Sequence, residues 1–281
     1  MNDGRKRSRL AVVLSKYLLL SITLLLFAGP LVWLLSTMMK TKAETYKAPP
    51  AIFPEQFTFE SFERLFAVQP LMWRWIENSL IISVFVVVGV VLSSSIVAYG
   101  FARFATKYKD KLFSIVLVTL MIPPSIMMIP SYVLYTKLGW VDTWLPLIVP
   151  AWLGSAYYIF LFRQFFLSIP LELDEATYLD GGSRWTVYTR VIMPLSKPIV
   201  ITTIILAFVN SWLDFLGPFL YIKDNIKFTL SVGLQLLIGQ TSQDFPALAA
   251  GAFISIVPIG LLYFFGQRYI VEGVVLTGTK G

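Results

Sequence analysis

The sequence contains neither cysteine nor histidine among its 281 residues. These absences exclude disulfide bonds, thiol nucleophiles, the common cysteine and histidine zinc sites, and the side chain that most often serves as a general base near neutral pH. Charged residues are also scarce, at 14% of the chain. We therefore predict no catalytic residue and no metal site in this chain.

Apolar residues make up 57% of the chain, and the mean hydropathy is +0.73. A soluble domain has roughly 45–50% apolar residues. The charges gather in short clusters separated by long stretches with almost none, which is typical of a polytopic membrane protein. The net charge of +7 would suggest nucleic acid in a soluble protein. Here the basic residues lie mostly at the ends of apolar stretches, so we expect no nucleic-acid partner.

Six stretches that are nearly free of charge match the ~20 residues that a helix needs to cross ~30 Å of hydrocarbon. They are residues 17–39, 76–102, 112–136, 143–162, 198–222 and 245–267. The sequence thus predicts an all-α membrane protein with six transmembrane helices. The first stretch is too long for the apolar part of a signal peptide and lacks a clear cleavage site, so we expect it to be retained.

Lysine and arginine predict the orientation of these helices. With the N-terminus inside, the cytoplasmic segments hold 15 of the 23 basic residues, which satisfies the positive-inside rule. The 15 residues are Arg5, Lys6, Arg7, Arg9, Lys16, Arg103, Lys107, Lys109, Lys111, Arg163, Arg184, Arg190, Lys197, Arg268 and Lys280. We therefore expect residues 1–16 to form a cytoplasmic N-terminus, residues 17–281 to form one transmembrane domain, and the C-terminus to be cytoplasmic.

The predicted outer segment, residues 40–74, carries four prolines and so cannot be one continuous helix. Thr58 is a candidate helix N-cap within it. Apolar side chains follow at helical spacing, at Phe59, Phe62, Leu65 and Phe66. We expect a short interfacial helix here, with an irregular loop as the alternative.

The most polar stretch between predicted spans is the cytoplasmic loop of residues 168–196. Pro170 suits the first turn of a helix, and three acidic residues after it suit the positive end of the helix dipole. Gly181 and Gly182 can end that helix. A second helical stretch should run from Ser183 to Pro194, with Trp185, Tyr188 and Ile192 near one face. A helix that short needs something to pack on.

This loop also carries a spaced motif. It reads Glu175, Ala176 and Thr177, then Gly181 after three residues, then Val191, Met193 and Pro194 after nine more. The spacing resembles the cytoplasmic motif of the permeases of binding-protein-dependent ABC importers: EAA, three residues, G, nine residues, I-x-L-P. Thr177, Val191 and Met193 depart mildly from that pattern.

The resemblance extends along most of the chain and is strongest to the carbohydrate branch, in particular the maltose-permease type of subunit. Further strings that carry it, in the same order, are PEQFTFESFERLF, IPPSIMMIPSYVLYTKLGWVDT, NSWLDFLGPFLY and RYIVEGVVLTGTKG. The resemblance implies the fold of a type I ABC importer permease in the inner membrane of a prokaryote. It also implies a second, different permease subunit, two cytoplasmic ATPase subunits, an extracytoplasmic solute-binding protein and a carbohydrate substrate.

In that family the loop docks into a groove of the ATPase and transmits its closure to the helices. The resemblance therefore implies that a coupling helix is formed here by Glu175, Ala176, Asp180, Gly181 and Pro194. The alternative is that Glu175 merely caps its helix and Gly181 merely ends it. ATP and Mg²⁺ would be bound by the partner, because the C-terminal glycines Gly273 and Gly278 lack the lysine and hydroxyl order of a phosphate-binding loop.

Asp214 is the only acidic residue deep within a predicted span, and an intramembrane charge is a candidate for function. Asn210 lies four residues earlier, on the same face of a helix. We predict a substrate path that includes Asn210, Trp212, Asp214 and Tyr132, since hydroxyl-rich ligands are held by hydrogen bonds and apolar ring contacts. The alternative places Asp214 near the outer end of the helix, in water or paired with Lys223.

Two other classes of membrane protein remain as alternatives. A secondary transporter driven by an ion gradient would place paired ionisable residues near the midplane, whereas only Asp214 qualifies. A membrane enzyme would need clustered carboxylates, histidine or cysteine in the spans. The loop motif discriminates, because it serves an ATPase partner and has no use in either alternative.

Overall fold

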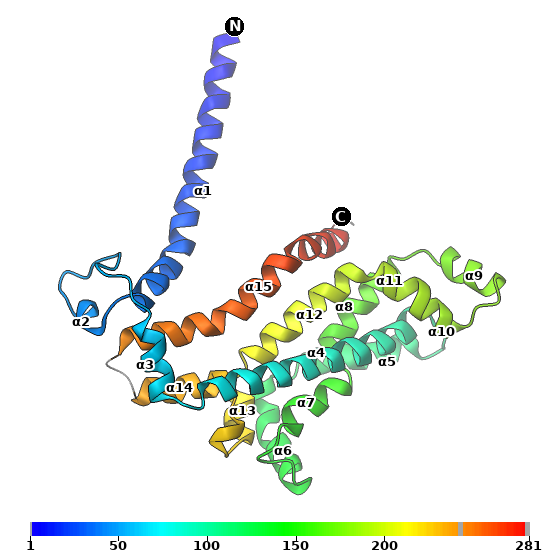
Figure 1. Ribbon diagram of the computed structural model, residues 1–281. Coiled ribbons are helices and arrows are strands. Elements are labelled where there is room, and N and C mark those ends of the chain that lie inside the picture. Colours follow the sequence, from blue (N-terminus) through cyan, green and yellow to red (C-terminus); the bar gives the residue numbers. More distant parts are fainter. Residues whose placement is uncertain (1, 241–243, 279–281) are drawn as a thin grey trace. The chain divides into compact units, whose positions relative to one another are not determined.

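The computed structural model describes residues 2–240 and 244–278, and the regular elements in these ranges are all helical (Figure 1). They are α1 (Asn2–Met38), α2 (Lys42–Thr45), α3 (Glu60–Val68), α4 (Met72–Arg103), α5 (Lys109–Thr119), α6 (Pro124–Lys137), α7 (Leu145–Trp152), α8 (Ala156–Leu167), α9 (Glu172–Leu179), α10 (Arg184–Thr186), the π-helix η1 (Val187–Ile192), α11 (Met193–Leu195), α12 (Lys197–Trp212), α13 (Leu216–Tyr221), the 3₁₀-helix η2 (Asn225–Lys227), α14 (Leu230–Gln240) and α15 (Phe245–Gly278).

Six membrane spans can be formed from these helices, as predicted. Four stretches are long and apolar enough to cross by themselves: Val13–Met38, Met72–Arg103, Leu145–Leu167 and Phe245–Tyr269. Two further spans are broken. α5 and α6 meet at 93°, and Arg184–Leu195 meets α12 at 76°. By length and composition the described residues hold four spans, or up to six if each bent pair counts as one span, which agrees with the predicted all-α polytopic fold.

The breaks correct two of the predicted spans. The third is not one helix, because Pro123 is extended (φ −60°, ψ 132°) and Pro124 begins α6, so residues 120–123 turn the chain. The fifth is also divided, since α12 ends at Trp212 and α13 begins at Leu216. Lys280, one of the basic residues used for the orientation, lies outside the described residues.

The chain divides into two compact units. One comprises the residues up to Pro70 together with Leu236–Ile254, and the other comprises Leu71–Gln235 together with the residues from Ser255 onward. We call them the first and the second unit. The organisation as a single transmembrane domain stays a prediction.

In the first unit, the short helix expected in the outer segment is confirmed as α3. Its cap differs from the expectation: Phe59 is the N-cap, while the Thr58 hydroxyl accepts a hydrogen bond from the Glu60 N–H at 3.2 Å. Arg64 Nε lies 3.0 Å from Asp244 Oδ2, and Asp244 Oδ1 accepts from the Ala247 N–H at 3.1 Å. Asp244 thus caps α15 and anchors α3 to it.

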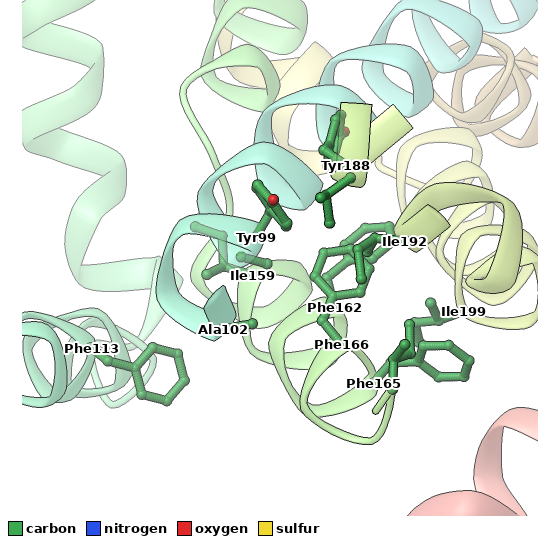
Figure 2. Packing of buried hydrophobic residues seen from close by; sticks show 13 residues of the cluster. Tyr99, Ala102, Phe113, Ile159, Phe162, Phe165, Phe166, Tyr188, Ile192 and Ile199 are labelled. Atoms are coloured by element: carbon green, nitrogen blue, oxygen red, sulfur yellow. The ribbon is translucent and has the colours of Figure 1, made fainter. Parts of the chain in front are cut away.

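The second unit is built around α4, which packs against α7, α8 and α12. Figure 2 shows the main cluster of buried side chains, where Phe162 and Phe166 of α8 lie beside Ile192 of η1 and Tyr99 of α4. Phe162, Phe166 and Ile192 are fully buried. Close packing of these large side chains therefore joins the long helix, α8 and the second half of the polar loop.

A glycine determines how closely α14 approaches α4. A Cβ atom on Gly233 would lie 1.9 Å from a ring carbon of Trp75. That ring is 1% exposed, and its Nε1–H donates to the Asn225 carbonyl at 2.7 Å, so it cannot move aside cheaply.

We predict that Gly233→Ala lowers the melting temperature of the detergent-solubilised protein, because overpacking a well-packed site costs roughly 1–3 kcal/mol. The matched control is Gly239→Ala in the same helix, where a Cβ meets no atom within 4 Å. The control should leave the melting temperature unchanged or raise it slightly. Equal melting temperatures for the two variants would contradict the close approach of Trp75.

Candidate coupling surface and internal cavity

The polar loop folds as its sequence predicts, into a helix, a tight turn and a second helical stretch. Helix α9 has Glu172, Asp174 and Glu175 in its first turn, where they favour the helix dipole. It ends in a Schellman motif, with Gly182 N–H donating to Thr177 O at 2.8 Å and Gly181 N–H donating to Tyr178 O at 3.0 Å. Gly181 has φ +80°, so a glycine is required there.

The second helical stretch runs from Arg184 to Leu195 and begins with a capping box. Ser183 Oγ accepts from the Thr186 N–H, and Thr186 Oγ1 accepts from the Ser183 N–H. Its middle is the π-helix η1, which shifts the face of the following residues. Tyr188 and Ile192 are buried, whereas Trp185 is 62% exposed, although its ring centroid lies 5.1 Å from that of Tyr188.

The structure places all five predicted coupling residues, Glu175, Ala176, Asp180, Gly181 and Pro194, on exposed positions of this loop. Two apolar side chains that the sequence analysis did not assign to the site are exposed beside them: Leu179, 90% exposed, and Trp185. These two side chains add apolar area to an otherwise polar loop. Leu179 could have been assigned from the sequence, because it follows Glu175 by four residues and so lies on the same face of the helix. We call these seven residues the coupling surface.

A cavity of about 240 Å³ lies within the second unit, between α4, α7, α8, α12 and α13. Its polar lining comprises Tyr158, Asn210, Ser211, Asp214 and Thr229, and its apolar lining comprises Ile82, Val86, Val90, Leu147, Ala207 and Pro218. Asn210 Nδ2 donates to the Tyr158 hydroxyl at 3.1 Å. The cavity therefore combines hydrogen-bonding groups with apolar walls.

The structure brings Asn210 and Asp214 to this cavity but not through one helix. Asp214 lies beyond the end of α12, and its Oδ1 accepts from the Gly217 N–H at 3.1 Å. Asp214 therefore also satisfies a donor at the start of α13. No ion pair joins Asp214 to Lys223 among the described residues; the Lys223 N–H donates to Asp142 instead.

The other two residues predicted for the path lie elsewhere. Trp212 is 1% exposed, stacks on Phe208 and donates its Nε1–H to the Ser255 carbonyl at 2.9 Å. Tyr132 stacks on Tyr221 with ring centroids 6.3 Å apart. Neither side chain lines the cavity.

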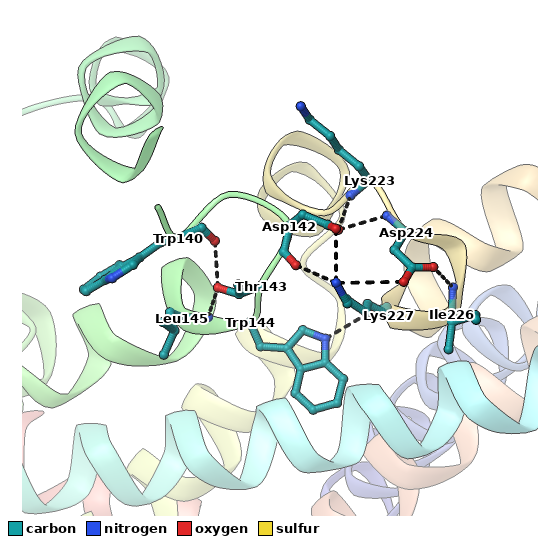
Figure 3. Close-up of polar contacts among 9 residues, drawn as sticks. All are labelled: Trp140, Asp142, Thr143, Trp144, Leu145, Lys223, Asp224, Ile226 and Lys227. Atoms are coloured by element: carbon teal, nitrogen blue, oxygen red, sulfur yellow. Dashed lines mark hydrogen bonds and ion pairs between the residues drawn. The ribbon is translucent and has the colours of Figure 1, made fainter. Parts of the chain in front are cut away.

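Figure 3 shows the contacts that join the loop after α6 to the loop after α13. Asp142 Oδ1 accepts from the N–H groups of Lys223 and Asp224 at 3.0 Å each, and Lys227 Nζ donates to Asp142 Oδ2 at 3.1 Å. Trp144 Nε1–H donates to the Lys227 carbonyl at 3.0 Å. These contacts position α7, α13 and Thr229, which line the cavity.

The same contacts change the chemistry of Asp142. Hydrogen bonds from the N–H groups of Asp224 and Lys223, together with the Lys227 ammonium, hold the pKa of the Asp142 carboxyl at about 2. Its backbone has φ +64°, a conformation that aspartate and asparagine tolerate better than most residues.

Residues 87–275 match the family described as "Binding-protein-dependent transport system inner membrane component". The chain belongs to this family. The matched part contains the whole coupling surface and the cavity-lining residues from Val90 onward. The protein is therefore a multi-pass membrane permease and not a catalytic subunit.

Two curated relatives and one solved structure illustrate this membership. An arabinooligosaccharides transport system permease of Halalkalibacterium halodurans is 36% identical over 81% of each chain. A sulfoquinovosyl glycerol transport system permease of Agrobacterium fabrum is 31% identical over 95% of this permease and 93% of the relative. A crystal structure of a bacterial ABC transporter involved in the import of alginate has the same fold, with a TM-score of 0.83, 22% identity, and coverage of 94% and 98%.

Family membership decides between the alternatives drawn from the sequence. The family is a transport permease family and not a family of catalytic subunits, and the relatives are named as permeases of sugar transport systems, which supports the importer permease over the secondary transporter. The coupling surface is thus best understood within a multi-subunit transporter.

We predict that Asp142→Asn lowers the melting temperature of the permease at neutral pH. The folded-state pKa of about 2 lies below the usual 3.8, so the carboxylate stabilises the fold above pH 3.8 and this contribution is lost as the pH falls through 2. The difference in melting temperature between wild type and variant should therefore shrink as the pH falls from 3.8 to about 2, the interval between the two pKa values. A control, Asp110→Asn, removes an aspartate whose side chain is 86% exposed. A difference for Asp142→Asn that does not change with pH would contradict this role.

Proposed function

We propose that this permease is one of two different membrane subunits of an ATP-driven importer that takes up carbohydrate from an extracytoplasmic binding protein. Two cytoplasmic ATPase subunits would bind ATP and Mg²⁺, and the permease would lie in the inner membrane of a prokaryote with both termini in the cytoplasm. The observation that carries the proposal is the exposed coupling surface, which lies at the family's motif.

The chemistry of the coupling surface supports an ATPase partner. Glu175 supplies a carboxylate that can pair with an arginine of the partner, and Leu179, four residues later, supplies apolar area beside it. Gly181 allows the sharp turn that presents both. Closure of the ATPases would displace this loop and switch the membrane helices between inward-facing and outward-facing states.

The cavity supports a hydroxyl-rich substrate. Asn210, Ser211, Tyr158 and Thr229 offer donors and acceptors for hydroxyl groups, while the apolar lining suits the faces of a sugar ring. A volume of about 240 Å³ is below the ~300–1,000 Å³ of typical ligand pockets. The cavity therefore has room for one sugar unit, and a longer substrate would extend beyond this subunit.

Several relatives agree with this substrate class, while others are named for sn-glycerol-3-phosphate. The former are named as permeases for arabinooligosaccharides and sulfoquinovosyl glycerol, and a further relative in Bacillus subtilis, 28% identical, for galactooligosaccharides.

The proposal is tested by tagging the permease, extracting it in mild detergent and identifying the proteins that co-purify in stoichiometric amount. An ATPase and a second permease are expected, and uptake of a radiolabelled sugar into vesicles should require ATP. Recovery of the permease alone, with uptake that proceeds without ATP, would contradict the proposal.

We predict that Glu175→Lys and Gly181→Val each abolish ATP-driven uptake while the permease is still inserted in the membrane. The first places a like charge against a basic partner, and the second strains a residue with φ +80°. Glu172→Gln, which changes an exposed carboxylate of the same helix, is the control and should transport normally. Insertion is measured by membrane fractionation. Normal uptake by both variants would show that Glu175 only caps its helix and that Gly181 only ends it.

We also predict that Asp214→Asn and Asn210→Ala alter the concentration of sugar that gives half-maximal uptake, because each changes a hydrogen-bonding group of the cavity. Gln267→Ala removes an exposed amide away from the cavity and should leave uptake unchanged. Uptake by both variants that matches wild type for several sugars would show that the cavity does not contact substrate.

A further inference from the structure

The cytoplasmic end of α4 and the coupling helix α9 face each other with matching pairs of side chains. On α4 the pair is Tyr99 and Arg103, and on α9 it is Asp174 and Tyr178, each pair four residues apart and so on one helix face. Arg103 Nε lies 3.0 Å from Asp174 Oδ2, and Tyr178 lies beside the Tyr99 hydroxyl. The two helices therefore meet through these side chains at the end of α4.

The charged pair at this contact is buried. The side chains of Arg103 and Asp174 are 3% and 7% exposed. Surface ion pairs contribute little, but removing one partner of a buried pair leaves an uncompensated charge and is strongly unfavourable. Burial raises the pKa of Asp174, and the Arg103 guanidinium opposes this shift.

Asp174 differs from the other two acidic residues of its helix turn. Glu172 and Glu175 are exposed and already satisfy the helix dipole. Asp174 alone is directed into the protein, and among the described residues its Oδ1 accepts no hydrogen bond. The burial of Asp174 is therefore compensated chiefly by the charge of Arg103. Capping of α9 does not explain why Asp174 is buried.

Arg103 also holds the chain that leads into α9. Its Nη2 donates to the Ile169 carbonyl at 2.9 Å, directly before Pro170. Two further residues of the same face of α4 hold the second half of the loop. The Tyr99 hydroxyl donates to the Arg184 carbonyl at 2.9 Å, and Ser95 shares a hydrogen bond with the Tyr188 hydroxyl at 2.8 Å.

Helix α4 continues from this contact to the cavity. Its residues Ile82, Val86 and Val90 line the cavity, about 20–30 Å from Arg103 at 1.5 Å per residue. The contact between α9 and α4 thus joins the coupling helix to the helix that lines the cavity.

We propose that the Arg103–Asp174 ion pair is the positioning contact that fastens the coupling helix α9 to α4, so that the two move together during transport. The inference rests on the proposed coupling role of the loop. It predicts that breaking the pair uncouples ATP hydrolysis from uptake and leaves the ATPase itself active.

The test uses the whole transporter, purified and reconstituted in vesicles, and measures sugar taken up per ATP hydrolysed. Arg103→Gln and Asp174→Asn are each expected to lower this ratio at least tenfold, and Arg103→Lys, which keeps the charge, should restore most of it. Asp110→Asn is the control, because it breaks a second arginine–aspartate pair at which Arg163 and Asp110 are 3.7 Å apart and the carboxylate is exposed. Wild-type ratios for both Arg103→Gln and Asp174→Asn would overturn the proposal.

A second measurement remains decisive if those variants fold poorly. The permease has no cysteine, so Arg103→Cys combined with Asp174→Cys provides the only two thiols in this subunit. Joining them with a short thiol-reactive crosslinker should restore coupled uptake, because the two helices are proposed to stay together. A crosslink that forms and leaves transport blocked would overturn the proposal. Failure of the proposed function is distinguishable, since wild-type uptake would then not require ATP.

Discussion

The packing of α4 is the constraint on which the rest of the second unit depends. This helix contacts α7, α8 and α12, supplies three residues of the cavity wall, and ends at the coupling loop. Its polar side chains are used at both ends: Trp75 and Asn78 bond to carbonyls of residues 225–228, and Ser95, Tyr99 and Arg103 contact the loop. One long helix therefore connects the loops around residues 225–228 to the coupling loop. In hydrocarbon, where unsatisfied polar groups are costly, such contacts specify positions firmly.

The fold and the coupling loop could be predicted from the sequence because both depend on local signals. Long apolar stretches predicted the spans, and Gly181 with Gly182 predicted the Schellman ending of α9, whose φ of +80° only glycine adopts readily. The breaks of the third and fifth spans could not be placed, because prolines within a span are compatible with a kink as well as with a break. The chain bends by 93° between α5 and α6, at Pro123 and Pro124, and α12 ends at Trp212, six residues before Pro218.

The candidate cavity was only partly predictable, because it depends on contacts between segments far apart in the sequence. Asn210 and Asp214 were found because they are polar within an apolar span. The sequence does not single out Tyr158 among several tyrosines, and it does not place Thr229 opposite Asn210. Trp212 was predicted to line the path only because it lies between Asn210 and Asp214 in the sequence. Its ring packs on Phe208 instead. The pairing of Arg103 with Asp174 likewise depends on a contact between residues 71 positions apart, and the burial of Asp174 distinguishes it from its exposed neighbours.

The docking of the coupling surface onto an ATPase is tested most directly by a single cysteine at its most exposed apolar residue. Leu179→Cys in the cysteine-free permease, labelled with a photoreactive maleimide in native membranes, should give a crosslinked product with an ATP-binding subunit. Phe53→Cys, which is also well exposed, at 69%, in the predicted outer segment, should not. Efficient labelling of Leu179→Cys without any product containing an ATP-binding subunit would contradict the assignment of this loop as the site of coupling.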